Sequence, residues 1–416
     1  MKKLVAIVLS LAMLLVSVSA MADLVICQNK VEITEQMEAY AKLYTEKTGV
    51  EVKIITGGGS SDYNTVLKSE MASGREPDIW VIEGPSGYEL WKDKIADQAG
   101  ADWTQYTAAA YMDGDKVVGF PVAVEGYGLA YNKSILDAAG IDPASITGPE
   151  SMKAAFETLD SKKDELGLTA VVGWYTEPAS LYWTTGQHMF GTYLDEGLAR
   201  DDTTYFDLLT DGGQLDIDRA TAWGEMVALF NQYSDQANMV SGTYDQQILN
   251  FASGKYAFVT QGSWIGATMT SDDADAYAEA GNFKVGFAPY AFEDGIDTIL
   301  TNSPSWWAVF KNDNSAASKA FLQWLTTDEA QEVLVMEAGF ISPFKSCKYS
   351  ATDPFAQTVT DYVSAGKTSS WHWLGDKEGL AQNYLGQVFN DYAQGKMDTA
   401  QFVQTVQQVC ATAYSG

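Results

Sequence analysis

The segment "DLVICQNKVEITEQMEAYAKLYTEKTGVEVKIIT" (Asp23–Thr56) decides the fold class of this chain. It opens with a short apolar run and closes with the alternating run "VEVKIIT", and both patterns are typical of β-strands. Between them Met37, Tyr40 and Tyr44 recur at helical spacing. Gly49 follows, where a glycine commonly ends a helix. A helix between two strands predicts a parallel pair, because parallel strands need such a crossover.

The same rhythm is repeated once more along the chain. The helical pattern "YNTVLKSEMASG" stops at Gly74, and "PDIWVIEG" follows as a third strand. We therefore expect an α/β fold with a parallel sheet and crossover helices. Later segments are less regular but still mix helices such as "RATAWGEMVALFNQYSD" with strands such as "FKVGFAPYAF". With 416 residues, the chain is long enough for two lobes, since single cores stop growing near about 250–300 residues.

The first 22 residues are typical of a secretory signal. Two lysines precede an apolar run, and Ala20 and Ala22 supply small residues at the cleavage positions. The run is too short for a comfortable bilayer span. We therefore expect a protein outside the cytoplasm, in the periplasm or at the cell surface. Cys27 raises the alternative of a lipid anchor, but it follows Ile26 rather than a small residue, so we expect a buried strand thiol.

The net charge of −29 argues against several classes of partner. A strongly acidic surface is a poor match for nucleic acid and for an anionic membrane, and its ordinary role is solubility. Three cysteines allow at most one disulfide within a chain, and whether Cys347 and Cys410 pair stays open. His188 and His372 are far apart and no Cys-x-x-Cys occurs, so we expect no metal and no cofactor. No G-x-S-x-G or Ser–His–acid pattern indicates an enzyme.

Five motifs of the later chain occur in an order that is found in a known family. They are "GFPVAVEGYGLAYNKSIL" (119–136), "FASGKYAFVTQGSW" (251–264), "SWWAVFKNDNSAASKAFLQWLTTDEAQEVL" (305–334), "MEAGFISPFKS" (336–346) and "YAQGKMDTAQFVQTVQQ" (392–408). With them the chain resembles the bacterial extracellular solute-binding proteins of ABC importers, the maltose-binding-protein-like group that carries sugars and oligosaccharides. Each motif is weak alone, but the resemblance extends over essentially all of the chain after the signal.

The resemblance implies a two-lobed, periplasmic-binding-protein-like α/β fold with hinge crossovers and a ligand cleft between the lobes. The bounds it implies are 23–122 and 302–345 for lobe 1, 128–297 and 353–416 for lobe 2, and hinge segments near 123–127, 297–302 and 343–353. It also implies a monomeric carrier that captures a sugar by lobe closure and delivers it to the permease subunits of the transporter. No covalent chemistry is expected.

Two alternatives remain open. A secreted glycoside hydrolase would need two positioned carboxylates, and acidic residues are abundant here. The order of the segments favours a binding protein instead. The same fold with a polyamine or another small solute as its ligand is the second alternative, and the acidic charge permits it.

A sugar site should combine aromatic rings, which stack on the C–H faces of a sugar, with planar polar groups that bond its hydroxyls. Trp264 in "QGSWIG" is the first stacking candidate. Trp371 and Trp373 in "SSWHWLG" are the next, because alternation along an extended segment points both the same way. His372 between them points the other way, and we expect it to be a structural hydrogen-bonding residue.

Most of the remaining candidates follow strands or stand near the implied crossovers, where a cleft would be lined. The resemblance implies Glu177 and Trp183, because the matching region of the family supplies an acidic residue and aromatic rings to the sugar. Alternation sends one of Trp306 and Trp307 outward, and Trp306 is the choice for the cleft. The full set of remaining candidates is Gln28, Asn29, Asp62, Glu83, Glu125, Glu177, Trp183, Asn302 and Trp306. For Glu125 the alternative is a hinge cap or a salt bridge. For the polar residues after the first two strands, loop solvation and helix capping are alternatives. Four other tryptophans are expected to pack in the core or against helices: Trp91, Trp103, Trp223 and Trp324.

Overall fold

The computed structural model describes residues 23–58, 63–303 and 305–415. The expected signal segment, residues 1–22, and the candidate Asp62 lie outside the described residues. Within them, no helix is both long and apolar enough to span a bilayer.

The first sheet has six strands in the order β2-β1-β3-β12-β5-β4. Their bounds are β1 (Leu24–Gln28), β2 (Val52–Thr56), β3 (Ile79–Ile82), β4 (Tyr111–Asp113), β5 (Lys116–Pro121) and β12 (Trp306–Val309). β1 pairs in parallel with both β2 and β3, which confirms the parallel sheet expected from the opening segment. The strand that returns late in the chain, β12, is antiparallel to its neighbours β3 and β5.

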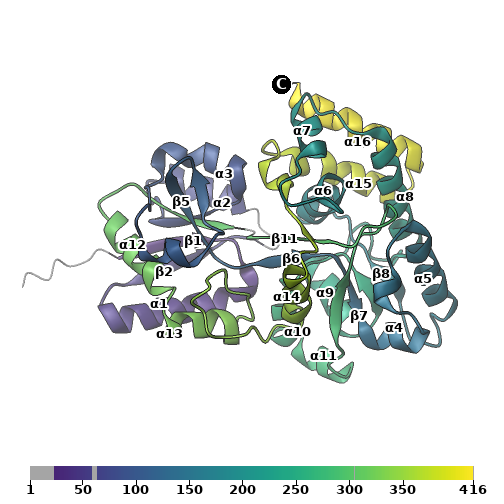
Figure 1. Cartoon of the computed structure of the whole chain (residues 1–416), viewed down its shortest axis with the longest axis horizontal. Helices are drawn as coiled ribbons and strands as arrows, with labels where there is room; N and C mark the ends of the chain where they lie inside the picture. Colours follow the sequence, from purple (N-terminus) through teal and green to yellow (C-terminus); the bar gives the residue numbers. More distant parts are fainter. Residues whose placement is uncertain (1–22, 59–62, 304, 416) are drawn as a thin grey trace, which may run out of the picture.

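Helices of the first lobe gather around this sheet on the left of Figure 1. They are α1 (Thr34–Thr48), α2 (Tyr63–Ala72), α3 (Gly84–Trp91), α12 (Ser315–Trp324) and α13 (Asp328–Glu332). The first helix ends as expected, because Gly49 adopts a left-handed conformation (φ 75°) that costs a glycine little. The segment "GPSG" begins α3 with a proline in its first turn, a position that tolerates proline.

The second sheet has four strands in the order β10-β7-β9-β8. Their bounds are β7 (Leu129–Asn132), β8 (Ala170–Gly173), β9 (Tyr256–Val259) and β10 (Val285–Ala288). The helices of this lobe lie on the right of Figure 1. They are α4 (Lys133–Ala139), α5 (Pro149–Ser161), α6 (Phe190–Asp195), α7 (Thr204–Thr210), α8 (Ile217–Tyr233), α9 (Tyr244–Ala252), α10 (Ile265–Thr270), α11 (Ala274–Glu279), α15 (Gly386–Ala393) and α16 (Thr399–Tyr414).

A small third sheet, β13-β11-β6, connects the two lobes, and Figure 1 shows β6 and β11 between them beside α14 (Ala356–Ser364). β6 (Glu125–Tyr127) carries the chain out of the first lobe, and β11 (Ile299–Asn302) carries it back. The two strands pair antiparallel, with Glu125 opposite Asn302. β13 (Thr368–Ser369) joins the other edge of β11 in parallel. The lobe and hinge bounds given above stay predictions.

Two of the cysteines, Cys27 and Cys410, and most of the tryptophans assigned to packing lie in the core. All three cysteines fall within the described residues and each is free. Cys27 is buried in β1, where burial raises the pKa of its thiol to about 12, as a strand thiol should behave. The packing tryptophans Trp103, Trp223 and Trp324 are buried. Trp91 differs, because it is half-buried at the end of α3 and lines the cavity described next.

Candidate functional site

A cavity of about 480 Å³ lies between the two lobes. The first lobe lines it with the loops after β1, β2 and β3 and with residues of α2 and α3. The second lobe lines it with residues between Ala179 and His188, with Tyr244 and Trp264, and with Trp371, Trp373 and residues of the chain that follows as far as Asn383. The cavity therefore faces the carboxyl ends of the parallel strands, where open α/β sheets usually bind their ligands.

The second lobe contributes an uncharged aromatic wall to the cavity. Five residues form this aromatic wall: Trp183, His188, Trp264, Trp371 and Trp373. The imidazole of His188 lies at its centre, with ring centroids 4.8 Å from Trp264, 5.2 Å from Trp371 and 5.0 Å from Trp373. The rings of Trp371 and Trp373 stack on each other at 5.8 Å and 25°. The wall is thus a packed set of rings whose positions depend on one another.

His188 is neutral in this environment. Burial and, to a smaller extent, the positive charge of Lys30 together lower the pKa of its imidazole to about 3. Tyr127 of β6 supports the wall from behind, with its ring 5.0 Å from the His188 ring and nearly parallel to Trp264 at 6.0 Å and 6°. The wall therefore presents polarisable ring surface without a formal charge.

The first lobe and the hinge contribute a polar wall: Asn29, Lys30, Glu32, Glu83 and Glu125. The ammonium of Lys30 lies 2.6 Å from the Glu125 carboxylate and 3.8 Å from that of Glu32. The Asn29 amide donates to Glu83 Oε1 at 2.6 Å. Most of these polar groups thus hold one another in fixed positions while lining the cavity.

Burial and mutual charge set the protonation of this wall. Burial raises the pKa of Glu32 to about 7; the Lys30 charge lowers it and the Glu125 charge raises it. Burial alone would lower the pKa of Lys30, but Glu125, Glu32 and Glu83 outweigh it and keep that pKa above its ordinary value. Lys30 is therefore charged at neutral pH, and it faces three carboxylates.

The two lobes touch each other at the rim of the cavity. Lys68 of α2 forms an ion pair of 2.5 Å with Glu378. The hydroxyl of Ser86 donates to the Leu374 carbonyl at 3.4 Å. Gly84 has a φ of 79°, and a β-carbon there would lie 2.6 Å from that of Leu374, so only a glycine allows this approach.

Seven of the residues expected in a sugar site line this one cavity: Asn29, Glu83, Glu125, Trp183, Trp264, Trp371 and Trp373. The structure places four others away from it. Gln28 is buried and donates to Thr56 and to the Lys30 carbonyl. Glu177 accepts hydrogen bonds from the backbone and hydroxyl of Ser180.

Asn302 and Trp306 also lie outside the cavity lining. Asn302 accepts from the Ser303 backbone at the end of β11. Trp306 is buried in β12, where its indole N–H donates to the Ala109 carbonyl at 2.6 Å and its ring packs on Tyr111 at 5.2 Å. Trp306 is the member of the Trp306–Trp307 pair expected at the cleft, and this expectation is wrong, because β12 is an inner strand of the sheet and all four of its residues are buried.

The cavity is also lined by three residues that were not predicted from the sequence: Lys30, Glu32 and His188. Lys30 follows the first strand directly after two residues that were selected, so the same strand-end rule would have included it. His188 has no comparable signal, because its ring partners come from four separate parts of the chain. Among the residues the structure describes, no group of three or more His, Cys, Asp or Glu could hold a metal ion.

Residues 39–361 match the family described as bacterial extracellular solute-binding protein. A relative described as an uncharacterized ABC transporter extracellular-binding protein, from Pyrococcus horikoshii, is 24% identical over 357 residues, which is 80% of this chain and 74% of the relative. The melibiose/raffinose/stachyose-binding protein MelE of Bacillus subtilis is 24% identical over 261 residues, which is 61% of this chain and 58% of MelE.

Solved structures share the fold over almost all of the chain. A chitin oligosaccharide binding protein has a TM-score of 0.75 at 18% identity and covers 95% of this chain and 99% of its own. A sugar transporter from Bacillus licheniformis in complex with stachyose has a TM-score of 0.73 at 16% identity, covering 94% and 100%. RafE in complex with raffinose has a TM-score of 0.71 at 18% identity, covering 94% and 99%. These likenesses confirm the expected fold class.

The neutral state of His188 gives a prediction that needs no ligand. Because the chain has only 2 histidines, the two imidazoles can be followed separately by NMR. We expect the His188 ring nitrogens to keep the chemical shifts of a neutral imidazole from pH 8 to pH 5, since burial lowers the pKa to about 3. A midpoint near 6.5 would contradict the packing of the aromatic wall.

The same burial predicts how stability depends on pH. The pKa of His188 is lower in the folded than in the unfolded chain, so the unfolded chain binds more protons between pH 6.5 and pH 3. Stability should fall as the pH drops through this window, with His188 contributing up to about 1.4 kcal/mol per pH unit. Chemical denaturation of a His188→Gln variant should show a flatter acid limb than the wild type.

Proposed function

Because the chain belongs to the bacterial extracellular solute-binding proteins, we propose that the interlobe cavity binds a neutral sugar or oligosaccharide. The chain is the solute-binding component of an ABC transporter. The observation that carries the proposal is the pairing of an aromatic wall from one lobe with a hydrogen-bonding wall from the other across one cavity.

The aromatic wall suits the apolar faces of a pyranose. A sugar ring carries C–H groups on its faces, and these pack on indole rings without any need for charge. Trp183 and Trp264 have ring centroids 6.1 Å apart and both line the cavity. His188 adds no charge, because its imidazole is neutral from mildly acidic to alkaline pH.

The polar wall suits the hydroxyl groups of the same ligand. Carboxylates and amides such as Glu83, Glu125 and Asn29 accept from or donate to sugar hydroxyls. They already hold hydrogen bonds or ion pairs within the protein, so their positions are fixed before a ligand arrives. The names of MelE and of the structural neighbours, which carry melibiose, raffinose, stachyose and chitin oligosaccharide, support the same ligand class.

We propose a transport cycle of capture and delivery. The open protein binds the sugar, the lobes close on it by bending at the crossovers, and the closed form docks on the permease subunits outside the cytoplasm. In this proposal the protein is a monomer, the lobes comprise residues 23–122 with 302–345 and residues 128–297 with 353–416, and no covalent step takes place.

One observation favours a second ligand class, a polyamine or another small cation. The polar wall sets three carboxylates against the single ammonium of Lys30. Such an excess of negative charge would attract a cation. The burial that raises the pKa of Glu32 to about 7 weakens this attraction, because it keeps that carboxyl partly protonated at neutral pH.

Titration calorimetry with a panel of solutes tests the ligand class. We expect a neutral sugar among melibiose, raffinose and chitobiose to bind, and a sugar acid such as digalacturonate to bind at least about tenfold more weakly, because like charges would face each other at the polar wall. Binding of spermidine with no binding of any sugar would replace the proposal with the polyamine alternative. Release of shorter sugars from a bound oligosaccharide would indicate a hydrolase.

Trp183→Ala tests the aromatic wall. Trp183 is half-buried and lines the cavity, so its removal should weaken sugar binding by about ten- to a hundredfold while shifting the thermal melt little. Trp306→Phe is the matched control, since this ring packs in the first lobe outside the cavity lining. The control should keep its affinity. Equal losses in the two variants would mean that the cavity is not where the sugar binds.

A further inference from the structure

The three residues Trp371, His372 and Trp373 face two different environments. Both tryptophans line the cavity, whereas His372 is absent from the lining and meets Asp195 on the opposite side. Asp195 is buried, with 1% of its surface exposed, and it holds the segment at two atoms. One carboxylate oxygen shares a hydrogen bond with His372 Nδ1, and the other accepts the His372 backbone N–H at 2.9 Å.

A single continuous helix contacts this segment along its length. It runs from Thr184 to Asp195, as a wide π-turn stretch followed by α6. His188 touches both indole rings. Gly191 lets the ring of Trp373 approach, because a β-carbon there would lie 2.7 Å from its Cδ1 atom. Positions 188, 191 and 195 follow one face of the helix, so one rigid element sets the ring positions and the backbone between them.

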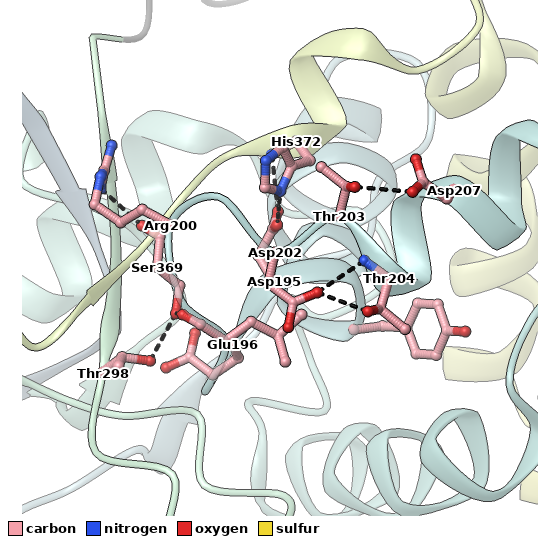
Figure 2. A network of polar contacts seen from close by, with 12 residues as sticks. Asp195, Glu196, Arg200, Asp202, Thr203, Thr204, Asp207, Thr298, Ser369 and His372 are labelled. Atoms are coloured by element: carbon pink, nitrogen blue, oxygen red, sulfur yellow. Dashed lines mark hydrogen bonds and ion pairs between the residues drawn. The ribbon is translucent and has the colours of Figure 1, made fainter.

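The chain just before Trp371 is fixed as well, as Figure 2 shows. Arg200 donates to the carbonyls of Ser369 at 3.0 Å and Thr301 at 2.8 Å, and so joins β13 to β11. The Ser369 hydroxyl donates to the Leu198 carbonyl at 2.7 Å. The end of α6 and the loop after it therefore clamp the segment, with Asp195 at His372 and with Leu198 and Arg200 at Ser369.

The indole N–H groups give the rings no anchor of their own. Those of Trp371 and Trp373 are buried and have no hydrogen-bond partner in the part of the chain that the structure describes. The rings are held by packing and by their backbone, so an anchor on the residue between them has an unusually direct effect on both.

We propose that Asp195 and His372 are positioning residues for the tryptophan pair of the sugar site, and that sugar binding is coupled to the protonation of His372. This inference rests on the proposed function for its sugar ligand. The placement of the two rings by Asp195 and His372 does not depend on that function. Asp195 and His372 act on the two indole rings through the backbone of residues 371–373, and neither residue contacts the sugar.

The charges around His372 favour its protonated form. The hydrogen bond to Asp195 raises the pKa of His372; its burial and the charge of Arg200 lower it, and the charges of Asp195 and Asp202 raise it. Burial also raises the pKa of Asp195, against the effect of His372. The positive charge of Arg219 lowers the pKa of Asp195. The negative charge of Asp195 in turn raises the pKa values of the buried Glu196 and Asp376.

The sign of the effect follows from this direction. A histidine whose pKa is raised on folding contributes stability that is fully present below its unfolded pKa and is lost as the pH rises through the folded value. The segment 371–373 is therefore held most firmly below the ordinary histidine pKa of 6.5, and it loosens as the pH rises through the raised folded value. By reciprocity, a sugar that needs the rings in place should raise the pKa of His372 when it binds.

The first test needs no ligand. Near-UV circular dichroism reports the coupled signal of the stacked Trp371–Trp373 pair. We expect this signal to change with pH along the NMR titration curve of His372, which is the histidine expected to titrate in this range. Asp195→Asn should show the alkaline form of the signal at every pH. An unchanged signal in Asp195→Asn, at all pH values and with the fold intact, would overturn the proposal.

Conservative variants keep the test valid if Asp195→Asn does not fold. His372→Gln can still bond Asp195 but cannot titrate, so its signal should be independent of pH, whereas His372→Ala should show the signal of neither form. Asp202→Asn is the matched control: it removes a negative charge that acts on His372 but bonds Thr204 and not the 371–373 segment. We expect that control to leave the signal in place.

The second test measures the coupling, with raffinose and stachyose as probes. We expect the His372 pKa to rise in the wild type on binding, and Asp195→Asn to bind about tenfold more weakly at pH 6. A bound sugar that leaves the pKa unchanged would refute the coupling. If neither sugar binds the wild type, that part of the ligand proposal fails, while the dichroism of the ligand-free protein still decides whether the pair positions the rings.

Discussion

The antiparallel pairing of β6 with β11 is the connection on which both lobes depend. β6 bonds at Glu125 with Lys30 of the first lobe, and two residues later Tyr127 packs behind His188 and Trp264 of the second lobe. One strand of three residues thus touches both walls of the cavity. A ligand that moved either wall would therefore act directly on β6, without a relay of intermediate residues.

Different interactions hold the side chains of the two walls in place. The aromatic wall is fixed by packing, because each ring fills space against the others and the central imidazole is neutral. The polar wall is fixed by charge, with the Lys30 ammonium set against the carboxylates of Glu32 and Glu125. A neutral sugar suits both, since it stacks on the first and bonds the second without bringing a charge that must be compensated.

Sequence reasoning succeeds here where a local rule decides the outcome. The helix ends at Gly49 because a left-handed residue is needed there, and Asn29 reaches the cavity because it follows a parallel strand. It fails where residues that are distant in sequence determine the surroundings of a side chain. Trp306 is buried on a strand whose faces are both covered, although it is the member of its pair expected at the cleft. His188 depends on rings from several separate segments, which no spacing in the sequence reveals.

The contacts at the rim contribute little to closing the lobes. Lys68 and Glu378 are each about half exposed, and an ion pair in that setting contributes about 0–1 kcal/mol. The hydrogen bond from Ser86 to the Leu374 carbonyl is long, at 3.4 Å. In the proposed cycle, a ligand that fills the cavity and touches both walls at once would therefore supply much of the free energy of closure. A carrier needs this arrangement, because lobes that closed firmly on their own would neither admit a ligand nor release it.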